Sequence, residues 1–344
     1  MKVGLVYDPI YLRHDTGHHV ENAERLSAVI DHLEGAGLKE RLKPIEPRAA
    51  SAKELLLAHQ RQYISYIQGV AQRGGGWLDA DTVVSADSYQ VAAYAAGGVI
   101  RAVEQVLAGE VASAFALVRP PGHHATWRRA MGFCLFNNVA IAAKYAMNNC
   151  GLESVLIIDF DVHHGNGTQE AFYSDPGVLY VSTHQYPHYP GTGGIEETGS
   201  RMARGTTLNI PLPAGCGDIE YLRVFKKIVV PAARRFKPQL ILVSAGYDAH
   251  WADGLSMMQL TVAGFAQMVA IIKELAQELC HGYLVFALEG GYELTVLASS
   301  VAATLNVLRD SDEVDDPLGE SPRQFGAPDI EGLVRAIKEI HNLA

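Results

Sequence analysis

Cysteine is scarce in this chain of 344 residues. Its four cysteines, Cys134, Cys150, Cys216 and Cys280, are far apart, and no two of them form a C-x-x-C pair. This spacing argues against a disulfide framework and against a structural zinc site made of cysteines. We therefore expect reduced, mostly buried thiols and a fold that is held together by its core.

Long apolar runs and an excess of positive charge are also missing. No uninterrupted apolar stretch reaches about 18 residues, and the start MKVGLVYD is typical of a strand rather than of a signal peptide. The net charge of −10 argues against a general surface for nucleic acid or anionic membrane, although a basic peptide or a polyamine stays compatible as substrate. We expect a cytoplasmic protein without nucleic-acid or membrane partners, and a homo-oligomer remains open.

What is present is enough apolar sequence for a large core, with 48% hydrophobic and 19% charged residues. From residue 114 onward, short apolar segments alternate with helical stretches, which predicts a parallel sheet covered by helices on both faces. The predicted strands are 3–7, 114–118, 154–158, 178–182, 207–210, 240–244 and 283–287. The predicted helices are 22–33, 87–108, 137–147, 219–236, 261–279, 294–308 and 330–341, with two short helices within 51–72. We expect one domain over 1–344, with a core over 1–310, an acidic loop over 310–328 and a last helix over 329–342.

The most informative stretch is 155–168, which reads VLIIDFDVHHGNGT. A short β-branched run is typical of a buried parallel strand, and here it leads into Asp159, Asp161, His163 and His164. On an extended segment the side chains of Asp159, Asp161 and His163 share one face, so they can reach one cation together. The plainer interpretation is a strand that ends in a polar loop with surface histidines. The neighbouring clusters favour the metal site.

Three more polar clusters each follow a predicted strand. They read RPPGHH at 119–124, AGYD at 245–248 and EGGY at 289–292. Each alone is weak, because P-P-G is a turn and G-G-Y can simply punctuate a loop. The carboxyl ends of parallel strands, however, meet at one edge of a sheet, where ligands bind. Together with 155–168, these clusters predict a single site at that edge.

The residue types in these clusters fit metal-assisted hydrolysis. Asp161, His163 and Asp248 offer three oxygen and nitrogen ligands and leave room for water and substrate, as catalytic zinc requires. The same ligands also suit iron or cobalt. His123 and His124 follow a rigid turn and can move protons near neutral pH.

Three further residues complete this prediction. Tyr292, between two glycines and a helix, is a candidate donor to a developing oxyanion. Asp159 and Asn166 are candidate partners that fix histidine tautomers. There is no G-x-S-x-G motif for an acyl-serine intermediate. The residues therefore indicate direct attack of water on an amide.

Five motifs in this order resemble the histone deacetylase family, which includes bacterial acetylpolyamine amidohydrolases and acetoin-utilisation proteins. They are RPPGHHA (119–125), GFCLFNN (132–138), DFDVHHGNGTQ (159–169), SAGYD (244–248) and LEGGY (288–292). The resemblance implies an arginase-like α/β fold, with a single parallel sheet of about eight strands and helices on both faces. It also implies zinc-dependent hydrolysis of an N-acetyl-lysine side chain or a related N-acyl amine.

The resemblance also implies roles for individual residues. The positions that match the zinc ligands are Asp161, His163 and Asp248. Those that match the catalytic group are His123, His124 and Tyr292, supported by Asp159 and Asn166, with His124 as general base and acid. An inner structural potassium ion is implied at Asp159, Asp161, His163, Ser182 and Thr183, and a second one near Phe172 and Val178. The positions that match the substrate channel and its rim are Gly132, Phe133, Tyr189, Leu255 and Asp81.

Four departures or loosely matched positions qualify this resemblance. Asn166 replaces an aspartate of some members, as in the class II and bacterial branch, and should leave His124 less basic. Val20 stands at the proline of an N-terminal H-P-E-x-x-x-R-L motif, within which Arg25 should tie loops together. Leu255 occupies the rim position where polyamine-selective relatives carry glutamate, which weakens a polyamine interpretation. Asp81 is either a rim acid or a simple turn aspartate.

Other functions stay open at this point. An acetylpolyamine or another small N-acyl amine is the alternative substrate, and the rim loops 8–21, 73–86 and 185–205 should decide it. A two-manganese ureohydrolase shares the fold, but His250 stands where its second acid is needed. A non-catalytic acyl-ligand binding protein would be expected to lack a catalytic histidine or Tyr292, and both are kept.

Overall fold

The computed structural model describes residues 2–322, 326 and 328–344. Eight strands form one sheet in the order β2-β1-β5-β10-β9-β6-β7-β8, and every pairing is parallel. The strands are β1 (Gly4–Val6), β2 (Lys43–Ile45), β5 (Ala114–Ala116), β6 (Val155–Asp159), β7 (Val178–Gln185), β8 (Thr207–Leu212), β9 (Leu240–Ala245) and β10 (Leu284–Leu288). The predicted parallel sheet of about eight strands is confirmed.

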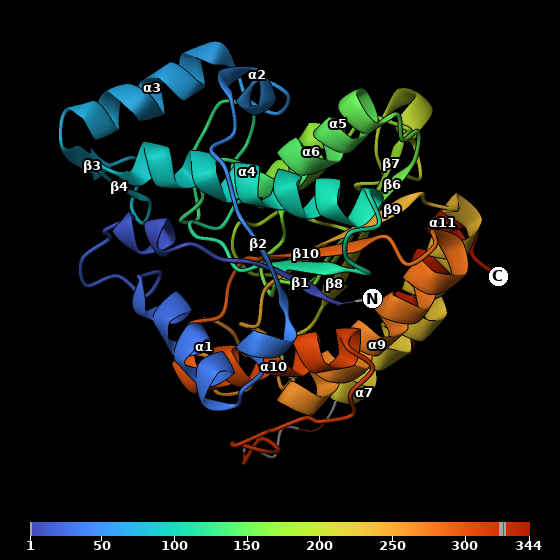
Figure 1. Ribbon diagram of the computed structural model, residues 1–344. Helices are drawn as coiled ribbons and strands as arrows, with labels where there is room; N and C mark the ends of the chain where they lie inside the picture. Colours follow the sequence, from blue (N-terminus) through green and yellow to red (C-terminus); the bar gives the residue numbers. More distant parts are fainter. Residues whose placement is uncertain (1, 323–325, 327) are drawn as a thin grey trace.

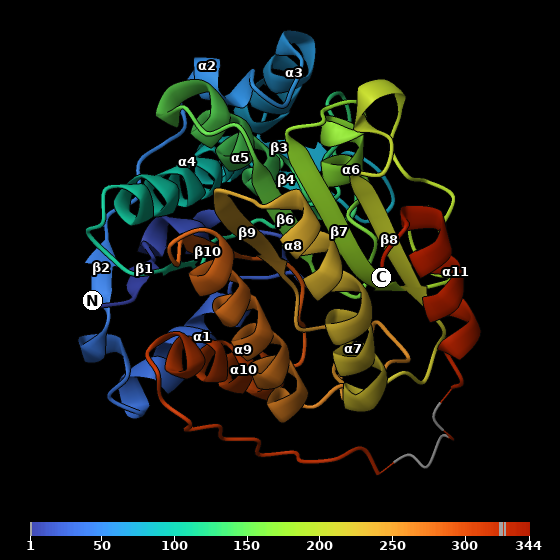
Figure 2. The ribbon, with the colours of Figure 1, turned by 90° about the vertical axis from the view of Figure 1, so that its right-hand side faces the viewer.

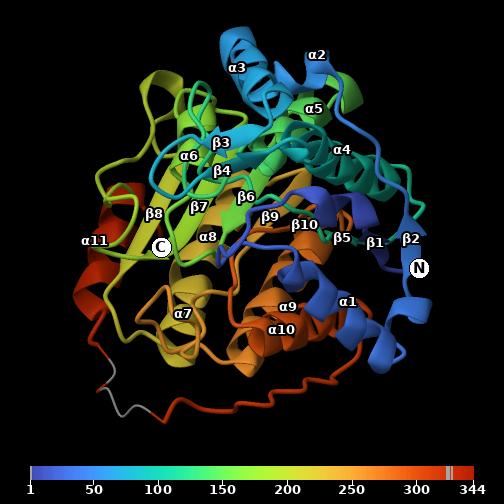
Figure 3. The same cartoon turned by 90° about the vertical axis from the view of Figure 1, so that its left-hand side faces the viewer.

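Helices cover both faces of the sheet, as Figure 1 shows. One layer contains α2 (Ala52–Leu55), α3 (Arg61–Gln72), α4 (Ser88–Leu107), α5 (Asn138–Cys150) and α6 (Asn166–Phe172). The other contains α1 (Glu24–Gly35), α7 (Asp218–Val224), α8 (Val230–Phe236), α9 (Val262–Leu279) and α10 (Leu294–Leu308). The last helix, α11 (Glu331–His341), lies beside β8 at one edge of the sheet (Figures 2 and 3).

Burial explains the sequence of the central strands. Every residue of β6, β9 and β10 is buried, because helices pack on both sides of the sheet. A strand buried on both faces reads as a continuous apolar run, and this is the pattern that made these strands predictable. One hydrophobic cluster extends from Val3 to Leu343 and includes both helix layers.

The strand β2 was not predicted from the sequence. It is three residues long and contains Pro44, which has no N–H to donate to a neighbouring strand. Proline is tolerated at the edge of a sheet, where one side of the strand has no partner, and β2 is the edge strand here. A hairpin of β3 (Gly75–Trp77) and β4 (Val83–Ser85) was also not predicted.

The predicted helices exist, with one correction. The stretch 219–236 is α7 and α8 separated by a π-helical turn, Phe225–Val229. Pro231 lacks the N–H that would bond to the carbonyl of Lys227, and the helix changes its hydrogen-bond register just before this residue. Ser51 is the N-cap of α2 and forms a capping box with Glu54.

Two further expectations concern the acidic loop and the cysteine thiols. Part of the expected acidic loop 310–328 lies outside the described residues, whereas its segment 311–322 forms neither helix nor strand. All four cysteines are free, and only Cys150 among them is exposed. Within the described part of the chain, we find no helix with the length and apolar character to cross a membrane.

Candidate active site

The sheet order brings the polar clusters together. β5, β10, β9 and β6 are neighbours, and each ends in one of the four clusters predicted from the sequence. The register aligns Asp159 of β6 with Ser244 of β9, and Leu288 of β10 with Ala245. The turns that follow these strands therefore leave the sheet at one edge and meet there.

Asp161, His163 and Asp248 converge on one point. His163 Nδ1 lies 3.1 Å from Asp161 Oδ1 and 3.2 Å from Asp248 Oδ2. The three potential ligand atoms lie within 4.8 Å of one another, and both carboxylates are fully buried. Among the described residues, none donates a hydrogen bond to Asp248 Oδ2. A buried carboxylate oxygen without a donor, beside an imidazole nitrogen, fits a metal ion as its missing partner.

The charges in this group demand a cation. Burial alone would lower the pKa of His163, but the adjacent carboxylates of Asp161 and Asp248 outweigh burial and raise it to about 10. Burial, followed by the repulsion of Asp161, raises the pKa of Asp248. Both shifts express the same excess of negative charge. A divalent cation held by two carboxylates and one imidazole would balance it.

Two glycines allow the ligands to approach the backbone. A Cβ atom on Gly246 would lie 2.0 Å from Asp161 Oδ2, and one on Gly290 would lie 2.1 Å from Asp248 Oδ2. The amide of Gly290 donates to Asp161 Oδ2 over 2.8 Å, so the absence of a side chain there also permits this hydrogen bond. Gly246 of the A-G-Y-D motif and Gly290 of the E-G-G-Y motif thus let the carboxylates pack directly against the backbone.

The tandem histidines have different partners. His123 Nδ1 lies 3.1 Å from Asp159 Oδ2, whereas His124 Nδ1 lies 2.8 Å from Asn166 Oδ1. Burial, followed by the charges of His123 and His163, lowers the pKa of His124 well below its usual value. Burial would also lower the pKa of His123, but Asp161 and Asp159 outweigh it and raise that pKa to about 10. His124 is therefore neutral and able to accept a proton, while His123 carries the charge.

The residues expected around potassium lie on β6, on β7 and in the loop after β6. Asp159 is paired in register with Ser182, and Thr183 follows on the same strand. Thr183 Oγ1 is buried and makes no hydrogen bond to the described residues, while Ser182 Oγ lies 2.8 Å from His184 Nδ1. Asp159 Oδ2 also accepts a hydrogen bond from the hydroxyl of Tyr180 over 3.0 Å.

A narrow cavity of about 240 Å³ opens over the histidines and the metal-type cluster. Its lining includes all five residues expected for the substrate channel and rim, together with both tandem histidines and the expected oxyanion donor. The lining residues are Asp81, Pro121, His123, His124, Gly132, Phe133, His163, His188, Tyr189, Leu255, Gly290 and Tyr292. Two edge-to-face ring pairs, His124 with Tyr189 and Phe133 with Tyr292, stiffen the walls.

The cavity also contains a residue that the sequence analysis missed. The ring of His188 stacks on that of His163 with centroids 5.1 Å apart, and its Nε2 donates to the carbonyl of Leu255 over 2.9 Å. Its place in the predicted rim loop 185–205 was the only available signal. Asp253 and Glu289 are two further buried acids near the site to which the sequence analysis gave no role.

Arg25, which was expected to tie loops together, lies behind the ring of Tyr292. Its guanidinium donates to the carbonyls of Gly291 and Glu289 over 2.7 and 2.6 Å and lies 4.8 Å from the ring centroid of Tyr292. On its other side it pairs with the buried carboxylate of Glu21. Arg25 therefore ties α1 to the turn after β10.

Glu21 is the centre of a second buried polar group. It pairs with Arg25 Nη1 over 3.1 Å and with Arg119 Nη2 over 3.0 Å, and His14 Nε2 lies 3.7 Å away. His14 belongs to the loop before α1, which also contains His18 and His19, and it contacts Ser88 and Glu21. None of the loop histidines lines the cavity over the metal-type cluster.

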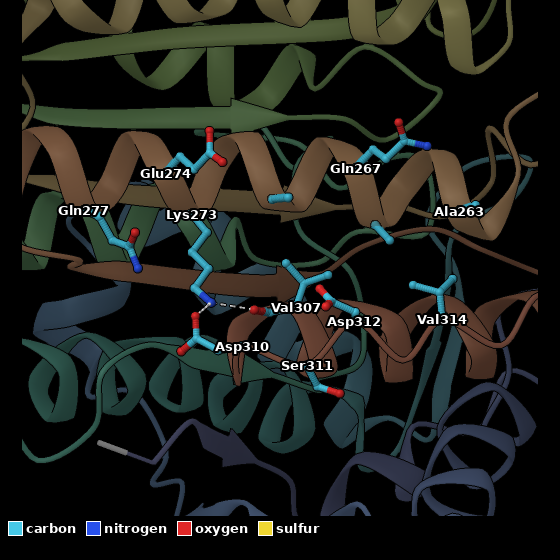
Figure 4. Close-up of a pocket in the computed structure, with 12 residues that line it drawn as sticks. Ala263, Gln267, Lys273, Glu274, Gln277, Val307, Asp310, Ser311, Asp312 and Val314 are labelled. Carbon is cyan, nitrogen blue, oxygen red and sulfur yellow. Dashed lines mark hydrogen bonds and ion pairs between the residues drawn. The ribbon is translucent and has the colours of Figure 1, made fainter.

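Size alone would not have located this site. A larger surface hollow, of about 540 Å³, lies between α9 and the chain that follows α10 (Figure 4). It is crossed by Lys273, which binds Asp310 and the carbonyl of Val307. Its lining has neither histidine nor tyrosine, and it lacks any group of potential metal ligands among the described residues. The smaller cavity is the one lined by the tandem histidines, His163 of the metal-type cluster and Tyr292.

Known proteins resemble this chain in sequence and in fold. The profile of the histone deacetylase domain matches residues 19–308. The rice protein named histone deacetylase 10, chloroplastic, is 42% identical, covering 96% of this chain and 79% of the rice protein. A probable deacetylase of Archaeoglobus fulgidus is 38% identical over 99% of this chain and 98% of its own. The crystal structure of the HDA15 HD domain superposes with a TM-score of 0.87 at 36% identity, covering 98% of this chain and 96% of that one. The chain therefore belongs to the histone deacetylase family.

Proposed function

We propose that this protein is a zinc-dependent deacetylase that hydrolyses N-acetyl-lysine side chains or closely related N-acyl amines. One observation carries the proposal. The Asp161, His163 and Asp248 cluster, the tandem histidines and Tyr292 all border one narrow cavity. Family membership gives deacetylation as the reaction class, and the donor set supports zinc as the metal.

The zinc ion would be held by Asp161, His163 and Asp248. When bound, zinc acts as a Lewis acid that polarises an amide carbonyl and makes water more acidic. The amides of Gly290 and Val162 donate to Asp161 Oδ2 and Asp248 Oδ1 over 2.8 and 3.0 Å, so each carboxylate is fixed before any metal arrives. Such pre-orientation limits the reorganisation needed for binding.

His124 is the proposed general base and acid. Its Nδ1–H is directed at Asn166 Oδ1, which leaves Nε2 to take a proton from the attacking water. The water oxygen bonds to the amide carbon, the C–N bond breaks, and His124 returns the proton to the leaving amine. His123, held charged by Asp159, stabilises the negative charge that develops on the former carbonyl oxygen.

Tyr292 is the proposed hydrogen-bond donor to that oxygen. Burial raises the pKa of its hydroxyl well above the usual value, so the proton stays on the oxygen and remains available for donation. Phe133, Tyr189 and His188 line the cavity, and a slender alkyl chain bound between them would displace water from it. Removal of water strengthens the electrostatic interactions inside the cavity.

A structural potassium ion is proposed beside β6 and β7. Asp159, Ser182 and Thr183 bring carboxylate, hydroxyl and backbone oxygens together, and hard monovalent cations prefer such oxygens. The backbone oxygens of Asp161 and His163 would complete the expected set.

The rim supports acyl-lysine more than a polyamine. Leu255 lines the cavity and offers no charge to an ammonium group. Asp81 also lines it, and burial, followed by the neighbouring Asp79, raises the pKa of Asp81. A peptide backbone, which presents N–H donors, would still find an acceptor in Asp81.

The test is hydrolysis of a panel by purified, metal-analysed protein. The panel contains an acetyl-lysine peptide, a trifluoroacetyl-lysine reporter, acetylspermidine and acetylputrescine. His124→Ala and Tyr292→Phe are each expected to lower turnover by roughly a hundredfold or more. The matched controls are His32→Ala on α1 and Tyr66→Phe on α3, whose tyrosine is 52% exposed. Turnover of the acetylated polyamines alone would identify a polyamine, rather than acyl-lysine, as the substrate. If zinc-loaded wild-type protein hydrolyses none of the four compounds, the proposal is overturned.

A further inference from the structure

The carboxylate of Asp253 contacts three backbone amides near the proposed active site. Its Oδ2 accepts from Tyr292 N over 2.7 Å and from Glu293 N over 3.2 Å, and its Oδ1 accepts from Leu255 N over 3.0 Å. The residue is 4% exposed, and no cation contacts it among the described side chains. Burying an unpaired carboxylate is costly, so these three amides are what keeps it there.

We infer that Asp253 is a positioning residue for Tyr292. It holds the backbone from which the tyrosine ring extends and so sets the direction of the hydroxyl. The inference deepens the proposed function and rests on it, because Tyr292 matters for turnover only if the protein hydrolyses an amide.

The turn before Tyr292 is held by Arg25 through the carbonyls of Gly291 and Glu289, but the tyrosine side chain itself has little support for its direction. It follows Gly290 and Gly291, and Gly291 has φ of 114°, so the preceding chain is intrinsically free to rotate. Its ring contacts Phe133 and Arg25, yet its hydroxyl makes no hydrogen bond to any described residue. These contacts fix the plane of the ring less strictly than a hydrogen bond would. The hydrogen bond from the N–H of Tyr292 itself to Asp253 therefore adds a directional constraint to those that Arg25 places on the preceding turn.

The same carboxylate reaches the rim of the cavity. Through Leu255 N it fixes the turn whose carbonyl accepts from His188. Ser256, the next residue, donates its hydroxyl to the carbonyl of Asp248 over 2.7 Å. The loop from Asp248 to Ser256 thus links the metal-type cluster, the tyrosine and the rim, and Asp253 is its central contact.

The experiment is a double-mutant cycle with Asp253→Asn and Tyr292→Phe, measured with the zinc-loaded protein. Asparagine keeps the shape of aspartate but has a single acceptor oxygen. It can therefore accept from the amides of Tyr292 and Glu293 or from the amide of Leu255, but not from both sets. We expect kcat for the trifluoroacetyl-lysine reporter to fall between about ten- and a hundredfold with little change in KM. In the Tyr292→Phe background the same change should cost less than about twofold, because the hydroxyl it positions is absent.

Further measurements separate positioning from a general structural role. Zinc content should stay at the wild-type level. The Kd of a hydroxamate probe should rise in Asp253→Asn relative to wild type, whereas the double variant should show no further rise relative to Tyr292→Phe. Asp329→Asn is the control, since Asp329 accepts from Glu331 N in a similar turn away from the cavity. If Asp253→Asn does not fold, Asp253→Glu, which keeps the charge and displaces the oxygens, takes its place in the cycle.

Two results would overturn the inference. One is an equal loss in both backgrounds, which would mean that Asp253 supports the fold and not the tyrosine. The other is unchanged kcat and Kd in Asp253→Asn. Failure of the proposed function is recognised separately, because wild-type protein would then turn over no acyl substrate.

Discussion

Two buried charged clusters lie beneath the same edge of the sheet, and they differ in their charge balance. In one, Glu21 is matched by the guanidiniums of Arg25 and Arg119. In the other, Asp161 and Asp248 lie beside His163, and His123 Nε2 lies 3.8 Å from Asp161 Oδ1, whereas no arginine or lysine of the described chain reaches either carboxylate. Both clusters are almost completely buried.

Burial of charge therefore does not identify a functional site by itself. In the Glu21 cluster two guanidiniums face one carboxylate and donate their remaining N–H groups to backbone carbonyls, which fixes the placement of α1 and of the turn before Tyr292. The Asp161 cluster is left with an excess of negative charge that the protein itself does not neutralise. An unbalanced buried charge is what a ligand can complete, and this contrast can be tested.

The largest effect is expected from Asp248→Asn. Removing one of the three proposed zinc ligands should abolish stoichiometric zinc binding and lower turnover by at least roughly a hundredfold, since even partners of metal ligands are worth roughly ten- to a hundredfold. In metal-free protein the same change should leave stability equal or raise it, because it removes one of two repelling buried carboxylates. Metal analysis and chemical unfolding in chelator measure both. A clear loss of stability in the metal-free variant would contradict the charge imbalance.

Glu21→Gln should behave in the opposite way. Burial would raise the pKa of Glu21, but Arg119 and Arg25 outweigh burial and lower it from the usual 4.5 to about 2. The shift corresponds to roughly 3 kcal/mol of stability, fully present above about pH 4.5 and lost as the pH falls toward 2. The gap in unfolding free energy between wild type and variant should therefore shrink between pH 5 and pH 3. A gap independent of pH would show that the ionised carboxylate is not its source.

Asn166→Asp tests how a negative charge beside His124 changes the activity of the proposed active site. A carboxylate next to His124 Nδ1 favours the imidazolium and should raise the pKa of His124 by about one unit or more. Because the base must be neutral to act, the acidic limb of the kcat profile should move to higher pH by the same amount. Asn306→Asp, on the distant helix α10, is the control. An unmoved profile would argue against His124 as the base.

The smallest effect is expected at the rim. Leu255→Glu adds a negative charge to a partly exposed wall, where such a charge gains only about 0.5 to 1 kcal/mol from a cationic partner. Turnover of acetylspermidine relative to the acetyl-lysine peptide should rise by a factor of about two to five. Leu255→Gln separates charge from size. An equal gain with glutamine would remove the electrostatic explanation.

The central sheet and the residues of the main cluster were predictable, for a physical reason. β6 and β9 are apolar because both of their faces are buried, and the polar residues that follow them stand out against that background. Asp161, His163 and Asp248 could be assigned to one site because parallel strands share their carboxyl edge.

What the sequence did not reveal depends on contacts between loops. The role of Asp253 arises from amides at positions 255, 292 and 293, and no periodicity connects these positions. His188 reaches the cavity because its loop folds over His163, which only the tertiary structure determines. The strand β2 is too short, with its proline, to give an alternating pattern.

The bare backbone at Gly246 and Gly290 has a consequence for how such an enzyme can change. Any side chain at either position would collide with Asp161 or Asp248, so the floor of the cavity tolerates no substitution without displacing a ligand. The walls carry no such restriction, since Phe133, His188, Tyr189 and Leu255 contribute side chains of adjustable size and polarity. Substitutions in the walls and the rim can thus adapt the cavity to new acyl groups or amines, in evolution or by engineering, while the floor remains constant.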